Sequence, residues 1–291
     1  MSIEADADAG RPAATGDGND WLRQAGAFAS RDLRELVRNR AVLFWSLGFP
    51  AGFYLLTVAV FIPDGQVPDD AMPTVKAATA IGYGIFGATI VCLNAFGQHL
   101  VSDLEDRRYA QFRSLPIYPS ADLAGRTVAA LSFAFVAFGF VLAVSVGTGA
   151  AYALRSPAAI PVVIGALALS SVLWLVVALA IAVLVRDARY ANIISISVAM
   201  VAYFLTGYNG TSPNAFTADP ELLNLIPNSL AARIVVYNLL DAPNWATTGL
   251  TPPVMPSGPA YLGLLAAYAA ACTVIGVALM RSQVYDRGVT R

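Results

Sequence analysis

Long apolar stretches with almost no charged residue among them recur along this 291-residue chain. Six of them are long enough to cross a bilayer, whose hydrocarbon core is about 30 Å thick and needs roughly 20 residues of helix. They cover residues 41–62, 77–100, 127–154, 156–185, 190–208 and 260–280. The pattern therefore predicts an all-α, polytopic membrane protein with six transmembrane helices.

The basic residues are distributed unevenly among the segments that connect these stretches. If the N-terminus is cytoplasmic, 15 of the 18 basic residues lie in cytoplasmic segments, and only Lys76, Arg155 and Arg233 lie outside. Lysine and arginine are normally concentrated in the cytoplasmic loops of membrane proteins. We therefore predict a multi-pass protein of the plasma membrane with both termini in the cytoplasm.

The composition also indicates a membrane protein, and the net charge argues against nucleic-acid binding. The chain is 57% hydrophobic and only 13% charged, whereas soluble domains carry about a quarter charged residues. The net charge of −1 offers no basic field for nucleic acid. We predict a protein embedded in membrane lipid that does not bind nucleic acid.

The chain begins with a polar tail over residues 1–19, followed by an amphipathic segment over residues 20–40. Apolar residues recur there at steps of three and four, at Leu22, Ala25, Ala29, Leu33 and Leu36. Trp21 stands at its start, and the polar faces carry Arg23, Arg31, Arg34 and Arg38. This pattern is typical of a helix lying in the membrane interface. Such a helix either only anchors the chain to lipid or also contacts a cytoplasmic partner.

The connecting segments differ greatly in length. The external turn at 155–159 and the cytoplasmic turn at 186–189 are minimal, so the segment at 101–126 is the main cytoplasmic loop, and residues 281–291 form a second cytoplasmic tail. The external segment at 209–259 contains apolar stretches at 221–226 and 229–240, separated by Pro227 and Asn228. Proline interrupts a helix and Asn228 can cap the next one. We predict an external re-entrant helical hairpin before the last span.

Residues that could act in catalysis, bind a metal or bind a phosphate group are scarce. The single lysine, Lys76, is not part of a phosphate-binding loop, so the chain has no ATPase motif of its own and is not expected to be an enzyme. The single histidine, His99, has no second His or Cys at a ligand spacing, which predicts a structural role and no metal site. Cys92 and Cys272 lie inside predicted spans and are expected to pack there. Ion-coupled carriers usually place charged residues at membrane depth, and these spans contain almost none.

Residues 104–127 read Leu-Glu-Asp-Arg-Arg-Tyr-Ala-Gln-Phe-Arg-Ser-Leu-Pro-Ile-Tyr-Pro-Ser-Ala-Asp-Leu-Ala-Gly-Arg-Thr. This segment resembles the cytoplasmic signature of ABC-2-type transporter permeases, with the closest likeness to daunorubicin-resistance-type drug exporter subunits. The resemblance implies contacts with an ATPase through Glu105, Asp106, Arg107, Arg108, Tyr109, Phe112, Arg113, Ser114, Leu115, Pro116 and Arg126. Tyr109 and Phe112 can act as apolar anchors in a groove of a soluble partner. The alternative is a solvated loop whose arginines only fix topology.

The resemblance also implies the partners and the path. A separate cytoplasmic ABC ATPase subunit would hold the ATP and Mg, and this chain would bind no cofactor. Two permease subunits, identical or paired, would move a hydrophobic or amphipathic small molecule or a lipid along their interface. Spans two and five would line the path with Asn94, Gln98, Asn192 and Ser195. Two other functions stay open, an ATP-independent scaffold or regulatory subunit and an intramembrane enzyme that uses His99.

Overall fold

The computed structural model describes residues 18–62, 67–105, 117–185, 187–204, 220–242, 245 and 255–280. Regular structure within these residues is helical, without a strand. Five stretches are long and apolar enough to cross a membrane: Arg40–Phe61, Met72–Leu104, Ser120–Val146, Ala159–Leu184 and Pro259–Leu279. A further helix, α9 (Ala188–Phe204), has 17 residues, and the span predicted at 190–208 continues past it into residues outside the described part. The predicted all-α, polytopic class is confirmed.

The N-terminal helix α1 (Gly18–Arg38) is separated from the first span at Asn39. The side-chain oxygen of Asn39 accepts hydrogen bonds from the backbone nitrogens of Ala41 (3.1 Å) and Val42 (3.2 Å), which is the usual way that Asn caps a helix. The first span then consists of α2 (Arg40–Leu43), η1 (Phe44–Gly48), α3 (Phe49–Leu56) and η2 (Thr57–Phe61). The break between the two helices therefore lies at Asn39, close to the boundary expected between residues 40 and 41.

The second span is the central helix of the subunit. It consists of α4 (Met72–Ile90), the π-helical segment η3 (Val91–Phe96) and α5 (Gly97–Glu105), and its most apolar window is entirely buried. A Cβ atom added to Gly84 would lie 2.8 Å from Phe138 Cδ2, and one added to Gly87 would lie 3.0 Å from the carbonyl oxygen of Ser46. These glycines therefore serve close packing against neighbouring helices.

The connection between spans three and four is longer than the sequence suggested. α7 (Pro119–Val146) ends well before residue 154, and α8 begins only at Ala159 (Ala159–Leu184). Gly149 has a φ of 87°, a conformation that glycine adopts without strain and that ends the helical path here. Beyond it, the backbone nitrogen of Ala153 donates to the carbonyl oxygen of Leu239 (2.9 Å). The connection is therefore longer than the minimal turn at 155–159 that was expected, and it is hydrogen-bonded to α10.

The segment before the last span contains two short helices, as predicted. They are the 3₁₀ helix η5 (Pro220–Asn224) and α10 (Pro227–Leu239), followed by α11 (Pro259–Leu279). With 13 residues, α10 is about 20 Å long and too short to cross a bilayer. Ile226 holds the N-cap position of α10, and Asn228 instead donates from Nδ2 to the carbonyl oxygen of Ala202 (2.7 Å). The expected capping role of Asn228 is therefore wrong.

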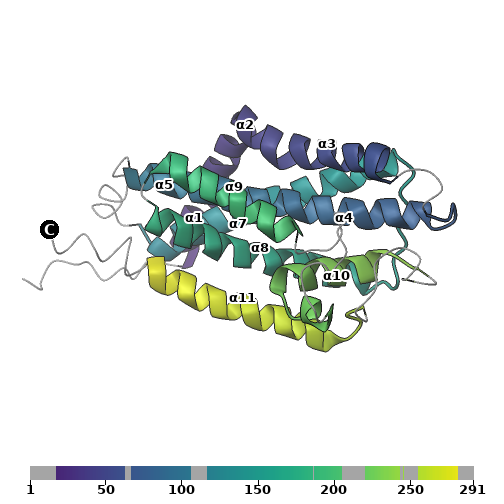
Figure 1. The fold of residues 1–291 in the computed structure, drawn as a ribbon. Coiled ribbons are helices and arrows are strands. Elements are labelled where there is room, and N and C mark those ends of the chain that lie inside the picture. Colours follow the sequence, from purple (N-terminus) through teal and green to yellow (C-terminus); the bar gives the residue numbers. More distant parts are fainter. Residues whose placement is uncertain are drawn as a thin grey trace, which may run out of the picture.

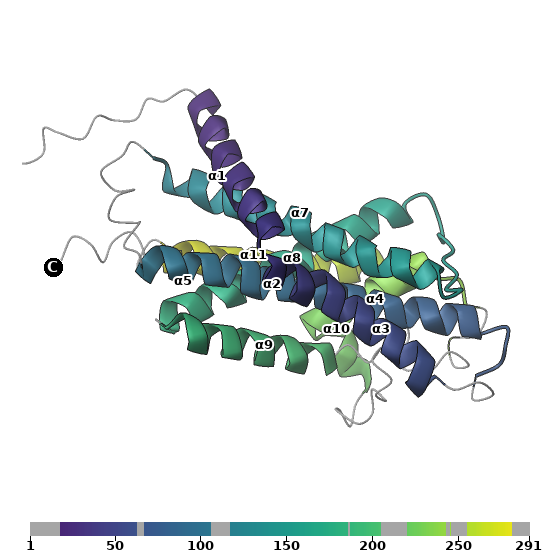
Figure 2. The same ribbon diagram turned by 90° about the horizontal axis from the view of Figure 1, so that it is seen from above.

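The long helices lie side by side along one axis (Figure 1). α1 crosses α7 at a steep angle at one end of this bundle, and α10 lies toward the other (Figure 2). We call these the α1 end and the α10 end. Large apolar side chains remain exposed on the outer faces of the helices, among them Val60, Val136, Phe140, Val274 and Ile275. This outward apolar surface suits contact with lipid.

Candidate coupling site at the α1 end of the bundle

The coupling segment predicted at 101–126 is described only at its two ends: residues 101–105 belong to α5 and residues 119–126 to α7, so both ends are helical and not part of a loop, whereas residues 106–116 lie outside the described residues. α5 ends at Glu105, whose side chain is outside the description, and α7 begins at Pro119. Nine residues expected to contact an ATPase lie outside the described residues: Asp106, Arg107, Arg108, Tyr109, Phe112, Arg113, Ser114, Leu115 and Pro116. Their contact with an ATPase stays a prediction, and the described helices show what such a contact would act on.

α1 lies in very close contact with the start of α7. A Cβ atom added to Gly125 would lie 2.5 Å from the carbonyl oxygen of Ala25, 2.6 Å from Phe28 Cβ and 2.9 Å from the backbone nitrogen of Ala29. Only glycine lets two helix backbones approach so closely. The glycine next to Arg126 in the sequence motif is therefore the point at which α1 rests on α7.

Two hydrogen bonds extend this contact toward the predicted loop. The indole nitrogen of Trp21 donates to Ser120 Oγ at 2.9 Å, and the backbone nitrogen of Tyr118 donates to Gln24 Oε1 at 2.9 Å. Tyr118 immediately precedes α7. The chain that enters α7 from the predicted coupling loop is thus fixed to the first turns of α1.

Arg126 was expected on the cytoplasmic loop, and the structure corrects this position. It lies two turns inside α7 and is only 2% exposed. Its Nε donates to Asp122 Oδ1 at 2.8 Å, and its Nη2 pairs with Asp103 Oδ2. Its Nη1 lies 4.0 Å from Asp32 Oδ2. Because the guanidinium is buried among these carboxylates, Arg126 does not present its charge to a partner.

The ion pairs connect three separate elements. Asp32 belongs to α1, Asp103 to α5 and Asp122 to α7, and all three are buried. Arg31 of α1 adds a second cation, with Nη2 at 2.9 Å from Asp32 Oδ1 and 3.4 Å from Asp103 Oδ2. We call Arg31, Asp32, Asp103, Asp122 and Arg126 the charge cluster. Removing the buried Arg126 would leave the three buried carboxylates with less compensating charge, and breaking a buried ion pair in this way typically costs about 3–5 kcal/mol.

The remaining residues expected on the interface helix face different ways. Trp21 and Arg31 point to α7 and to the charge cluster, as described above, whereas Arg34 and Arg38 are exposed. Leu22, expected on the apolar face, is also exposed, and Leu36 is buried. The half of α1 nearest the first span is therefore more deeply packed than the half that contains Leu22. Arg34 and Arg38 remain accessible to lipid headgroups or to another protein.

His99 faces α1 across the end of the second span. Its Nδ1 lies 3.3 Å from Glu35 Oε2, and one ligand atom from each of Asp32, Glu35 and His99 lies within 4.8 Å of the others. Carboxylate and imidazole groups at this spacing can hold a metal ion. However, Arg31 and Arg126 lie against the same Asp32 carboxylate, and their positive charge opposes a cation at that position.

Two of the four polar residues expected to line a path are hydrogen-bonded to each other inside the bundle. Gln98 Nε2 donates to Asn192 Oδ1 at 2.7 Å, which joins α5 to α9. Asn94 and Ser195 are buried, and no hydrogen-bond partner for Asn94 Oδ1 occurs among the described residues. Asn94 lies in the π-helical segment η3, a helix form often found at functional positions. A role in lining a path remains a prediction.

Comparison with protein families gives one match, to the model described as ABC-2 type transporter, over residues 23–215. The matched region includes α1, the charge cluster and five of the six predicted spans. It is about two thirds of the chain and identifies the family as a whole, so the drug-exporter type stays a prediction. No curated protein matches the chain. The chain therefore belongs to the ABC-2 type transporter family and is a multi-pass membrane permease.

Proposed function

We propose that this permease is the membrane subunit of an exporter that moves a hydrophobic or amphipathic small molecule, or a lipid, out of the cell. A separate cytoplasmic ABC ATPase would supply the energy and hold the ATP and Mg. Two permease subunits would form the path between them. The α1 end would face the cytoplasm, because 15 of the 18 basic residues are assigned to that side and such residues are normally retained there.

The observation that carries this proposal is the charge cluster that surrounds the two ends of the predicted coupling loop. The loop leaves α5 two residues after Asp103 and enters α7 three residues before Asp122. The cluster joins both helices to α1. A force applied to residues 106–116 would therefore reach the second span, the third span and α1 together.

This arrangement favours a mechanical role for the α1 end. An ATPase pair that closes on ATP would displace the loop, and the cluster would carry the displacement into the central helix. Because the most apolar window of the second span is buried on all sides, its movement changes the packing of its neighbours. Two access states must already exist, and the ATPase would shift the balance between them through contacts that differ in the two states.

The test is co-purification of the permease with a candidate ABC ATPase, which would be sought among the neighbouring reading frames. Phe112→Ala/Arg113→Ala should abolish recruitment of the ATPase, because it removes an apolar anchor and a charge from the predicted docking loop. Arg189→Ala/Tyr190→Ala is the matched control, since it removes an arginine and an exposed aromatic residue from the other cytoplasmic turn. The proposal is supported if the wild type and the control variant recruit the ATPase and the Phe112→Ala/Arg113→Ala variant does not. If wild type recruits no ATPase, an ATP-independent scaffold becomes the better hypothesis.

A further inference from the structure

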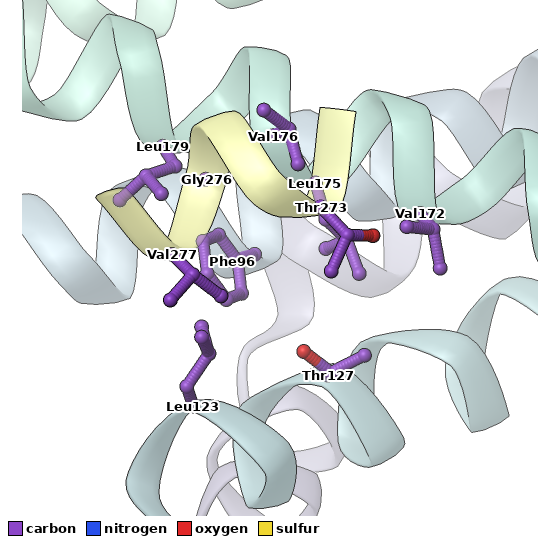
Figure 3. Close-up of a pocket in the computed structure, with 10 residues that line it drawn as sticks. All are labelled: Phe96, Leu123, Thr127, Val172, Leu175, Val176, Leu179, Thr273, Gly276 and Val277. Atoms are coloured by element: carbon purple, nitrogen blue, oxygen red, sulfur yellow. The ribbon is translucent and has the colours of Figure 1, made fainter. Parts of the chain in front are cut away.

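A cavity of about 170 Å³ lies among four elements in the half of the bundle near the α1 end. Figure 3 shows Leu123 and Thr127 of α7 across the cavity from Gly276 and Val277 of α11. Its floor consists of Phe96 at the end of η3 and of residues on α8, including Leu175 and Leu179. Both α7 and α11 pack on α8, so α8 forms the wall that joins the other two helices.

The lining is apolar. None of the ten lining residues is charged, and the only side-chain polar atoms are the hydroxyls of Thr127 and Thr273. Thr273 Oγ1 donates to the carbonyl oxygen of Ala269 at 2.8 Å, so its hydrogen is already used inside α11. Water needs two to four polar partners in a cavity, and apolar cavities stay dry. The occupant is therefore an apolar group.

The cavity is partly open, and exposed residues adjoin it. Thr273 at its edge is exposed, the neighbouring Val274 is 70% exposed and Val128 of α7 is 53% exposed. These residues belong to helices long and apolar enough to span a membrane, where the surrounding medium is lipid tails. Acyl chains are thus groups that can reach the open side of the cavity.

The size of the cavity selects among apolar occupants. A cavity of about 150 Å³ accepts a molecule such as benzene, and drug-sized ligands need about 300–1,000 Å³. A helix of a second copy, about 10–12 Å in diameter with its side chains, is too wide to enter. A single hydrocarbon chain is narrow enough. We propose that this cavity holds part of one acyl chain of a membrane phospholipid, between α7 and α11.

Labelling of buried lining residues distinguishes an acyl chain inside the cavity from lipid that only surrounds the protein. Leu175 is 4% exposed and Leu179 is 2% exposed, so a lipid that only surrounds the protein cannot touch them. Val274 on the same side is widely exposed and contacts any surrounding lipid. An acyl chain inside the cavity contacts Leu175 and Leu179 as well.

The experiment uses the full chain reconstituted in phosphatidylcholine vesicles that contain a phosphatidylcholine with a photoactivatable diazirine on one acyl chain. After irradiation, mass spectrometry maps the labelled residues. We expect adducts on Leu175 and Leu179 in addition to Val274. Val277→Trp, which fills the cavity, should remove the labelling of Leu175 and Leu179, whereas the matched Val274→Trp on the outer face of α11 should retain it.

A second probe separates a lipid chain from other apolar molecules. Adamantyl diazirine is small, apolar and not part of a lipid, and it is applied to the same vesicles. Labelling of Leu175 and Leu179 by the lipid probe, and its loss in Val277→Trp, supports the proposal. Labelling by adamantyl diazirine alone would show that the cavity accepts only compact molecules, and absence of both would show that it is closed or covered by another chain. Either result overturns the acyl-chain assignment.

Discussion

Substitution of Gly125 tests whether α1 is fixed to α7 by close backbone contact. In Gly125→Ala the new methyl group would lie 2.5 Å from the carbonyl oxygen of Ala25 and 2.9 Å from the backbone nitrogen of Ala29. These are backbone atoms, so no side chain can rotate away. Restoring an ordinary contact of 3.4 Å requires the helices to separate by about 0.9 Å. Overpacking of this kind costs about 1–3 kcal/mol.

The matched control is Gly139→Ala, also on α7, where no atom lies within 4 Å of the added Cβ. Both variants gain the same helix propensity, about 1 kcal/mol for Gly to Ala, so their difference isolates the clash. Hydrogen–deuterium exchange of peptides from residues 20–38 measures how often α1 detaches. A loss of 1–3 kcal/mol corresponds to exchange about 5- to 150-fold faster. If Gly125→Ala and Gly139→Ala exchange at equal rates, the close contact does not hold α1.

Three further predictions concern stability, measured by unfolding in mixed micelles. Arg126→Ala should destabilise the protein by about 3–5 kcal/mol, because it leaves buried carboxylates without compensation; a loss below 1 kcal/mol would contradict the charge cluster. Arg155→Ala should cost at most about 1 kcal/mol, because its cation–π contact with Tyr237 (4.1 Å) lies at the surface, and a larger loss would refute that surface assignment. A double-mutant cycle of Gln98→Ala and Asn192→Ala should give a coupling of about 0.6 kcal/mol, typical of hydrogen bonds between membrane helices, and strictly additive effects would exclude the bond.

The spans could be predicted because their signal is long and local. About 20 apolar residues without charge leave few alternatives in lipid, and the observed bounds of most helices lie within a few residues of the expected ones. The third span differed most. The sequence treated Arg126 as the last residue of a loop because a lone cation within a span is costly. Two of its compensating carboxylates, Asp32 and Asp103, belong to other elements, and no local pattern shows them beside it.

Part of the charge cluster did leave a signal in the sequence. Asp122 and Arg126 are four residues apart, the spacing at which helix side chains meet. Asp32 interrupts the apolar stripe of α1 next to Leu33 and Leu36, where a polar residue needs a buried partner. The identity of that partner depends on how α1 crosses α7, which is a tertiary feature. The cavity between α7 and α11 likewise arises from the spacing of three helices and has no sequence pattern.

The central claim is that the segment between α5 and α7 is the contact surface for an ATPase. The most direct measurement replaces Phe112 with a benzophenone amino acid and irradiates the permease together with the candidate ABC ATPase. Our account predicts a cross-linked product that contains the ATPase from position 112, and none from position 190, an exposed site in the first turn of α9, next to the other predicted cytoplasmic turn. Absence of a product at position 112, or equal products at both positions, would contradict the claim.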